Sequence, residues 1–320
     1  MSLRPRVLVF GGSGFVGRHV CEHLVRAGWQ VTVPTRKIGH AATVQCLPGL
    51  TVLHTPALDD ASLARLVAGH DAVVNLIAVL HGNAERFEQV HVALPERMAR
   101  ALQTTGVRRL VQVSALGADP QGPSMYQRSK ARGEAVLQAA GLQLTVLRPS
   151  VIFGAEDKFL NLFANLQSLL PLMPLAGSRT RFQPVWVADV AQAVLRCLQQ
   201  PQTIGQVIEA CGPDVMSLAE LVHRAGRWAG VNHGHGRPVL PLPRWVGWLQ
   251  ALAMELAPGE PLMSRDNLAS MAVDNVASGT LPGLQKLGIM PASAAAIAPL
   301  YLGRRGPRSR LDAWRAGHRG

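Results

Sequence analysis

Tyr126 and Lys130 are the first residues in this sequence whose types and spacing point to chemistry. Residues four apart on a helix share one face, so the phenol and the ammonium would lie side by side. A neighbouring ammonium, or the positive charge of a bound cofactor, can lower the pKa of a phenol and make it a usable acid or base. The chain has only two tyrosines and four lysines, which makes a chance pairing improbable. The alternative is a helix face on which a tyrosine is merely packed.

A glycine-rich turn lies near the start of the chain, where residues 7–17 read Val-Leu-Val-Phe-Gly-Gly-Ser-Gly-Phe-Val-Gly. Gly11 allows a tight turn off an apolar strand, Gly14 allows backbone to approach a pyrophosphate, and Gly17 allows the following helix to pack on the strand. The first N–H groups of that helix would face the anion. The pattern predicts a dinucleotide site, and the alternative is a turn that uses glycine for structure alone.

The end of the second expected strand selects between the two dinucleotides. An NAD site places a carboxylate there to bind the ribose 2′-hydroxyl, whereas this chain places Thr35, Arg36 and Lys37. A guanidinium matches a 2′-phosphate, which a carboxylate would repel. Arg36 and Lys37 therefore favour NADP(H), with NAD(H) as the alternative cofactor. The competing explanation is a basic pair that is simply exposed at the surface.

Strand-like and helix-like segments alternate through the first half of the chain. Strands are predicted at residues 6–10, 30–34, 50–54, 72–77, 109–114 and 144–148, and helices at 15–27, 60–68, 85–105, 126–140 and 188–199. This alternation predicts an α/β fold with a doubly wound parallel sheet of the Rossmann type. We expect a dinucleotide-binding core in 1–150, the remaining core elements with a small, mostly C-terminal cap in 151–302, and a disordered basic tail in 303–320.

The expected cap is rich in proline and in large apolar side chains. Residues 159–178 lack charge but contain asparagine and proline, so they predict a buried or lid helix that ends near Leu170 and no transmembrane segment. Residues 244–256 predict a helix, and we expect Trp245 and Trp248 to be buried in the cap. The alternative for these two side chains is a hydrophobic ligand wall or a partner surface.

Composition and charge limit the classes of function. The net charge is +12, and the tail is especially basic, with Arg304, Arg305, Arg308, Arg310, Arg315 and Arg319. Such a tail is either solvated or an arm for acidic lipid or an acidic protein, and no aromatic-basic platform suggests nucleic acid. Four spaced cysteines without a Cys-x-x-Cys pair indicate a reducing compartment and no structural metal. We see no signal peptide and expect a cytoplasmic location or a peripheral position at the inner face of a membrane.

Taken together, the glycine turn and the Tyr-x-x-x-Lys pair resemble those of the extended or atypical short-chain dehydrogenases/reductases. Later blocks extend the resemblance over residues 5–302. They look like the nucleotide-binding accessory subunit family of mitochondrial complex I (alpha subcomplex subunit 9 type) and its bacterial relatives. These blocks are Asn75–Leu80, Val90–Val92, Ser114–Ala118, Arg148–Gly154, Arg181–Val190 and Leu281–Gly288.

The resemblance implies a set of cofactor-binding positions. The pyrophosphate would be surrounded by Gly11, Ser13, Gly14, Phe15 and Gly17. The 2′-phosphate would be held by Arg36, with Lys37 beside it. The rest of the cofactor would be lined by Leu76, Ile77, Ala78, Val79, Tyr126, Lys130, Pro149, Ser150 and Val151. Tyr126 and Lys130 would lie at the nicotinamide ribose, whose hydroxyls the lysine can hold, and they form the candidate catalytic set together with Ser114.

Three departures from the family pattern weaken an enzymatic role. The serine or threonine that follows the fifth strand in extended reductases falls here on Ala115 or Leu116, with Ser114 slightly early. The acidic residue after the third strand is Ala57, and the asparagine of the fourth helix is His91, which we expect to be structural. A missing hydroxyl removes one hydrogen bond to a substrate carbonyl, a loss that can cost orders of magnitude in rate.

These observations leave two main functions. The first is an NADP(H)-binding protein of the complex I accessory type, with little or no turnover, associated with a membrane-bound respiratory or quinone-related assembly. The second is an active NADP(H)-dependent reductase or dehydrogenase that acts on an apolar carbonyl or quinone-like substrate through Tyr126 and Lys130. The intact pair favours the second function and the missing serine favours the first. A nucleotide-sensing interaction protein is a third alternative.

Overall fold

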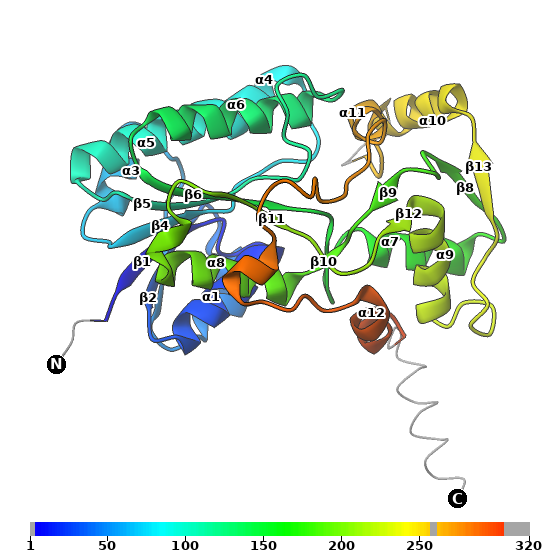
Figure 1. The fold of residues 1–320 in the computed structure, drawn as a ribbon, viewed down its shortest axis with the longest axis horizontal. Helices are drawn as coiled ribbons and strands as arrows, with labels where there is room; N and C mark the ends of the chain where they lie inside the picture. The colour runs from blue at the N-terminus through cyan, green and yellow to red at the C-terminus, as the bar shows by residue number, and fades with distance from the viewer. Residues whose placement is uncertain (1–3, 257–260, 304–320) are drawn as a thin grey trace, which may run out of the picture.

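The computed structural model describes residues 4–256 and 261–303, and a parallel sheet of seven strands lies at its centre (Figure 1). The strand order is β11-β6-β5-β4-β1-β2-β3. The strands are β1 Arg6–Phe10, β2 Gln30–Thr35, β3 Leu50–His54, β4 Ala72–Asn75, β5 Arg109–Val113, β6 Gln143–Pro149 and β11 Val207–Ala210. The direction of winding reverses between β1 and β4, which confirms the doubly wound Rossmann-type fold.

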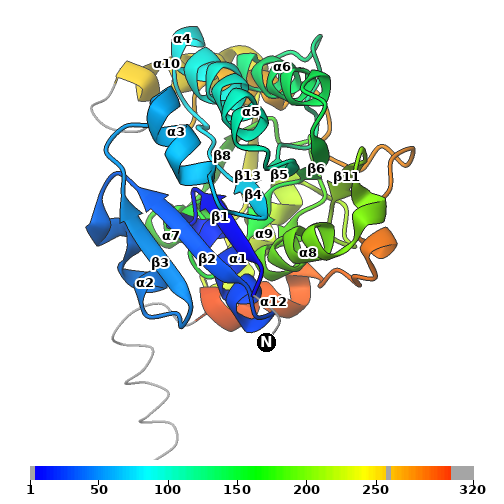
Figure 2. The same cartoon turned by 90° about the vertical axis from the view of Figure 1, so that its left-hand side faces the viewer.

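Helices cover both faces of this sheet, and Figure 2 shows the sheet between the two helical layers. One layer holds α1 Phe15–Arg26 and α8 Val187–Gln199, and the other holds α3 Asp60–Val67, α5 Leu94–Thr105 and α6 Met125–Ala139. The short elements α2 Ala42–Gln45, α4 Ala84–Glu88, η1 Ile38–Ala41 and η3 Pro201–Thr203 lie in connections. Alternation of strand and helix along the chain therefore becomes three layers in space.

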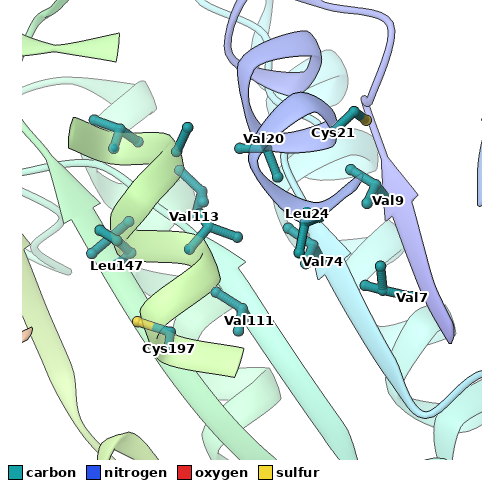
Figure 3. Packing of buried hydrophobic residues seen from close by; sticks show 14 of the residues in the cluster. Val7, Val9, Val20, Cys21, Leu24, Val74, Val111, Val113, Leu147 and Cys197 are labelled. Carbon is teal, nitrogen blue, oxygen red and sulfur yellow. The ribbon is translucent and has the colours of Figure 1, made fainter. Parts of the chain in front are cut away.

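The core on the α1 side of the sheet shows why these segments form these elements. Figure 3 shows Val20 and Leu24 of α1 facing Val7 and Val9 of β1 and Val74 of β4. The helical side chains are spaced four apart, and the strand side chains alternate, so each element presents one row to the other. All five side chains are fully buried, which stabilises each by roughly 1.5–3 kcal/mol relative to exposure.

The remaining elements form a cap, with its own apolar core, at the end of the molecule away from the N-terminus (Figure 1). Its strands are β7 Ile152–Phe153, β8 Met173–Ala176, β9 Arg181–Phe182, β10 Val185–Trp186, β12 Met216–Ser217 and β13 Val239–Leu242. Its helices are α7 Leu160–Leu169, α9 Leu218–Trp228, α10 Arg244–Leu256, α11 Arg265–Ser270 and α12 Ala294–Leu302. The short helix η4 Leu284–Leu287 instead packs in the core of the main sheet, beside α8 and β11. The division of the chain at residue 150 stays a prediction.

The helix predicted over 85–105 is not continuous. Between α4 and α5 the chain forms a π-helical turn, η2 Gln89–Ala93. Pro95 has no N–H to donate to the carbonyl of His91, so a regular α-helix would leave that carbonyl without its partner. The carbonyl instead faces α6 so closely that a Cβ at Gly133 would lie 1.9 Å from it. The local departure therefore allows α6 to pack tightly at His91.

The cap contains one clear correction. The prediction that Trp245 and Trp248 are buried is wrong, because their side chains are 68% and 45% exposed. They lie on α10, whose buried residues are the small Gly247 and Ala251.

The uncharged helix expected to end near Leu170 is α7, which ends at Leu169. None of the helices in 4–256 and 261–303 combines the length and apolar character needed to cross a bilayer.

Candidate functional site

The glycine turn joins β1 to α1 and leaves the start of the helix open. Gly11 has φ +77°, a left-handed conformation that glycine adopts without strain. The N–H of Gly14 donates to the carbonyl of Gly11 over 3.0 Å, and α1 begins at Phe15. No side chain caps this helix in the described ranges, so its first N–H groups are available to an anion.

The glycines of the turn differ in what surrounds them. A Cβ at Gly17 would lie 2.1 Å from the carbonyl oxygen of Gly11, and one at Gly12 would lie 2.7 Å from a methyl of Val33. A Cβ at Gly14 would meet only the Gly11 carbonyl, at 3.3 Å, and Gly14 is exposed. Gly12 and Gly17 are therefore required for packing, whereas Gly14 leaves space in front of the helix. The sequence motif gave Gly12 no role.

The flanks of this turn are polar on one side and aromatic on the other. Ser13 is half-buried within the turn, and the Phe15 ring lies 3.2 Å from where a Cβ at Gly154 would be. At the end of β2, the Thr35 hydroxyl donates to the carbonyl of Lys37 over 3.1 Å. Arg36 and Lys37 are exposed, and neither side chain is paired within the described ranges. Both cations are therefore free to meet a phosphate.

The segment after β4 follows the glycine turn closely. The strand ends at Asn75, two residues earlier than predicted, and the Asn75 side chain accepts the N–H of Ile77 over 3.1 Å. A Cβ at Gly11 would lie 3.2 Å from Leu76, so the two turns are in contact. The N–H of Val79 donates to Nε2 of His91 over 3.2 Å. Residues 76–79 are thus fixed by side chains at both ends, with Ala78 between them.

His91 is a buried structural histidine. Its Nδ1 lies 2.8 Å from the Ser129 hydroxyl, which in turn donates to the carbonyl of Tyr126 over 2.9 Å. Burial, with a smaller contribution from the Lys130 charge, lowers the pKa of His91 from 6.5 to about 3. The imidazole is therefore neutral at ordinary pH, and it connects the 76–79 segment to the helix that carries Tyr126.

A His91→Gln variant is expected to reduce the acid sensitivity of the protein. The unfolded chain protonates histidine near pH 6.5 and the folded chain near pH 3. The unfolded state binds more protons between these values, so the free energy of unfolding falls on acidification by up to about 1.4 kcal/mol per pH unit. Glutamine keeps a donor and an acceptor but does not titrate. Urea denaturation at several pH values measures the slope, and equal slopes for the two proteins would contradict this role.

Tyr126 and Lys130 lie near the start of α6, as the spacing predicted. The Lys130 ammonium donates to the carbonyl of Val113 over 3.2 Å. Burial lowers the pKa of Lys130 from 10.5 to about 8, against a smaller raising effect of Glu134. The Glu134 carboxylate is itself held by Arg148, with the closest pair of atoms 2.6 Å apart. The lysine is therefore a buried cation beside an already paired carboxylate.

The Tyr126 phenol differs from the expectation. Burial raises its pKa from 10.0 to about 12, so in this structure desolvation outweighs any lowering by the Lys130 ammonium. The ring packs edge-on against His91 and Phe87, with centroid distances of 5.5 and 6.2 Å. Because the ammonium does not lower the pKa of this phenol, a lowered pKa would depend on the positive charge of a bound cofactor.

Polar groups after β5 and β6 complete this end of the sheet. The Ser114 hydroxyl is buried and has no hydrogen-bond partner in the described ranges, which is unusual for a buried polar atom. Ala115 and Leu116, which stand at the positions of the serine or threonine of extended reductases, are buried as well. Pro149 ends β6, and the Ser150 hydroxyl donates to the Asn275 side chain over 2.6 Å. Val151 follows, partly buried against the cap core.

A distant segment, residues 264–275, crosses this end of the sheet, and sequence reasoning missed it. The carboxylate of Asp266 accepts the N–H groups of Met125 and Tyr126 over 2.7 and 3.1 Å. Asn267 donates to the carbonyl of Leu80 over 3.3 Å, and Asn275 to that of Leu116 over 3.3 Å. This crossing segment therefore ties together the loops after β4 and β5 and the start of α6. No local sequence signal announces bonds between residues more than a hundred positions apart.

Comparison with known proteins identifies the family of this chain. Residues 11–201 match the family described as NAD(P)H-binding. NADH dehydrogenase (ubiquinone) 1 alpha subcomplex subunit 9, mitochondrial, of Mus musculus is 37% identical over 291 residues, which cover 88% of this chain and 76% of that protein. A ceramide reductase of Caulobacter vibrioides is 27% identical over 253 residues, which cover 76% and 73%.

A solved structure shows the same fold at lower identity. The NADPH-dependent quinone oxidoreductase of Escherichia coli, complexed with NADPH, has a TM-score of 0.72 and 19% identity, and the match covers 91% of this chain and 97% of that one. The fold, the match to the NAD(P)H-binding family and the identity to the mouse subunit agree with one another. The chain therefore belongs to the NAD(P)H-binding Rossmann family, in the group that contains the complex I alpha subcomplex subunit 9 proteins.

Proposed function

We propose that this protein binds NADP(H) tightly, with little or no turnover, and acts as an accessory protein of a respiratory or quinone-related assembly at a membrane. The relatives named as complex I subunits support the assembly. The glycine turn supports the dinucleotide, because Gly14 is open and the start of α1 has no side-chain cap. The N–H groups there would hold the pyrophosphate.

The observation that supports low turnover is the lack of a hydroxyl side chain at residues 115 and 116, just after β5. Ala115 and Leu116 offer no hydroxyl where extended reductases place a donor for the substrate carbonyl, and the Leu116 carbonyl is bound by Asn275. Loss of one such donor typically costs roughly a hundredfold to a thousandfold in rate. Within this proposal, Lys130 would hold ribose hydroxyls and Tyr126 would lie beside them.

Nucleotide retention and turnover can be measured on one preparation. Mass spectrometry of small molecules released from the purified protein is expected to find NADP(H). Oxidation of NADPH is expected to stay near the uncatalysed rate across a panel of quinones and carbonyl compounds. Rapid oxidation, or a protein that neither carries nor binds a dinucleotide, would overturn the proposal.

The preference for NADP(H) is expected to depend on Arg36. An Arg36→Ala variant should lose most of the difference in affinity between NADPH and NADH, roughly 30-fold, since a hydrogen bond to a charged group is worth about 2 kcal/mol. Titration calorimetry of both nucleotides measures this. Arg65→Ala, which removes an exposed arginine from α3, is the matched control and should leave the ratio unchanged. Equal affinities for NADPH and NADH in the parent protein would contradict the preference.

A second candidate function is an NADP(H)-dependent reductase for an apolar carbonyl or quinone-like substrate. The specific observation that favours it is the buried Ser114 hydroxyl just beyond β5, at the same end of the sheet as Tyr126 and Lys130. This hydroxyl has no hydrogen-bond partner among residues 4–256 and 261–303. The bound nucleotide would supply the hydride, and Tyr126 would supply the proton to the carbonyl oxygen. Tyr126→Phe should then remove nearly all turnover at unchanged NADPH affinity. Turnover that survives this change would exclude Tyr126 as the proton donor.

A further inference from the structure

Helix α10 presents its large apolar side chains to the outside of the molecule. Trp245, Trp248, Leu249 and Leu256 are 68%, 45%, 51% and 80% exposed. Their spacing of three, one and seven residues places them along one face of the helix. The opposite face packs through Gly247, where a Cβ would lie 2.3 Å from the Cβ of Ala176 in β8. The largest apolar side chains of α10 therefore point outward, whereas those of a surface helix usually face the core.

Further exposed apolar side chains lie on the elements next to α10. β13 leads directly into α10 and pairs with β8, which places exposed Leu240 opposite exposed Pro174. Leu169, Leu170 and Leu172 lie before β8 and are 79%, 39% and 39% exposed. Figure 1 shows α7, β8, β13 and α10 together at the end of the molecule remote from β1, β2 and β3. We call the eight exposed leucine and tryptophan side chains of these elements the distal apolar surface. They are Leu169, Leu170, Leu172, Leu240, Trp245, Trp248, Leu249 and Leu256.

Charge around this surface is mainly positive. Residues 158–188 and 221–254, which hold all of these side chains except Leu256, contain arginines and a lysine but no aspartate or glutamate. Arg237 lies at one end, against the carbonyl of Gln167 in α7, and Arg244 begins α10 at the other. Arg265 lies 5.4 Å over the Trp248 ring and pairs with Glu255, the nearest carboxylate on α10, over 2.7 Å. The surface is therefore apolar with a cationic edge.

We propose that the distal apolar surface docks on an anionic lipid bilayer. Tryptophan is favoured at the boundary between headgroups and acyl chains, and leucine is favoured below it. Arginines at the edge can reach lipid phosphates while their stems stay in contact with apolar groups. A symmetric contact with a second copy would bring Arg237 and Arg244 against like charges, which disfavours a dimer through this face. The proposal is independent of cofactor binding and concerns a different end of the molecule.

Vesicle sedimentation of the full chain tests this proposal. The protein is expected to bind vesicles of phosphatidylcholine mixed with phosphatidylglycerol, and to bind phosphatidylcholine alone far less. The double variant Trp245→Ser with Trp248→Ser should bind the anionic vesicles at least about tenfold more weakly. Met290→Ser changes a side chain that is 85% exposed on another part of the molecule, and it should have no effect. Thermal melting and NADPH affinity should be the same for all three proteins.

A matched pair of arginine variants tests how much charge contributes to vesicle binding. Arg244→Glu should weaken binding to anionic vesicles, whereas Arg65→Glu on α3, with the same change of net charge, should not. Acyl chains brominated on the lipid should quench the fluorescence of the parent more than that of the double tryptophan variant. Absence of vesicle binding, or equal binding and quenching of the parent and the double variant, would overturn the proposal. Reversible dimerisation that only the tryptophan changes abolish, without vesicle binding, would overturn it in favour of a second copy.

Discussion

A Gly14→Val variant is expected to fold normally and to bind NADPH at least about 100-fold more weakly, a loss of ~2.7 kcal/mol. The backbone at Gly14 is extended, with φ −81° and ψ 178°, a conformation that β-branched residues adopt readily. A Cβ there would meet only the Gly11 carbonyl, at 3.3 Å. The valine methyls would then occupy the space in front of α1 that the pyrophosphate is proposed to fill. Calorimetry and thermal melting of one sample measure both properties.

Gly17→Ala supplies the contrasting result. Its single methyl would lie 2.1 Å from the Gly11 carbonyl oxygen and 2.6 Å from Cα of Gly12, and both are backbone atoms that cannot rotate away. Helix α1 would have to move off β1, so the free energy of unfolding should fall by more than about 3 kcal/mol. Gly39→Ala is the neutral control, because nothing lies within 4 Å of the new methyl. A Gly14→Val protein that binds NADPH normally, or that is as unstable as Gly17→Ala, would refute the division of roles.

What could be predicted from sequence follows from how local each signal is. The glycine turn is encoded within residues 7–17, and the Tyr126–Lys130 pair within one turn of helix, so both positions could be derived before the fold was known. The π-helical turn at His91 carried a local signal too, in Pro95. Its geometry depends on Gly133, which comes close only after α6 has packed. Pro95 therefore indicates from sequence alone that the helix is interrupted, whereas the packing of α6 that stabilises the interruption could not be predicted.

The parts that could not be predicted depend on long-range contacts. Asp266 and Tyr126 are far apart in the chain, and the bond between them forms only because the cap folds back across the sheet. The exposure of Trp245 and Trp248 likewise depends on which side of α10 meets β8. Both faces of that helix are apolar, so periodicity does not distinguish them. The small residues Gly247 and Ala251 decide the question, because they allow the closer approach.

Lys130→Met is expected to raise the stability of the protein at pH 7 while weakening NADPH binding. Burial lowers the pKa of Lys130 from 10.5 to about 8, a shift that corresponds to about 3 kcal/mol of destabilisation below pH 8. Methionine has a similar length and no charge, so it removes this cost but also the hydrogen bond to Val113, worth about 1 kcal/mol. The net gain should be about 2 kcal/mol, measured by urea denaturation.

The pH dependence of this gain identifies its cause. Between pH 8 and 10.5 the unfolded chain binds the lysine proton and the folded chain has released it. The stability of the parent therefore rises with pH across this window, by linkage, and the advantage of Lys130→Met should shrink. Burial raises the pKa values of Cys21, Cys197 and Cys211 from 9.0 to about 12. The unfolded chain loses these thiol protons first, so the free energy of unfolding falls with pH in the upper part of the window. Both proteins share that effect, so the difference between them isolates Lys130.

Tyr126→Phe is the control that separates the charge from the rest of the pair. It removes one hydroxyl from the same helix face, and it should leave both stability at pH 7 and NADPH affinity nearly unchanged. Lys130→Met should lower NADPH affinity at least about tenfold, because the lost donor is proposed to hold ribose hydroxyls. A Lys130→Met protein that is less stable than the parent at pH 7, with normal NADPH affinity, would show that the ammonium serves the fold. Greater stability together with weaker binding would show a buried charge kept for the ligand at a cost to the fold.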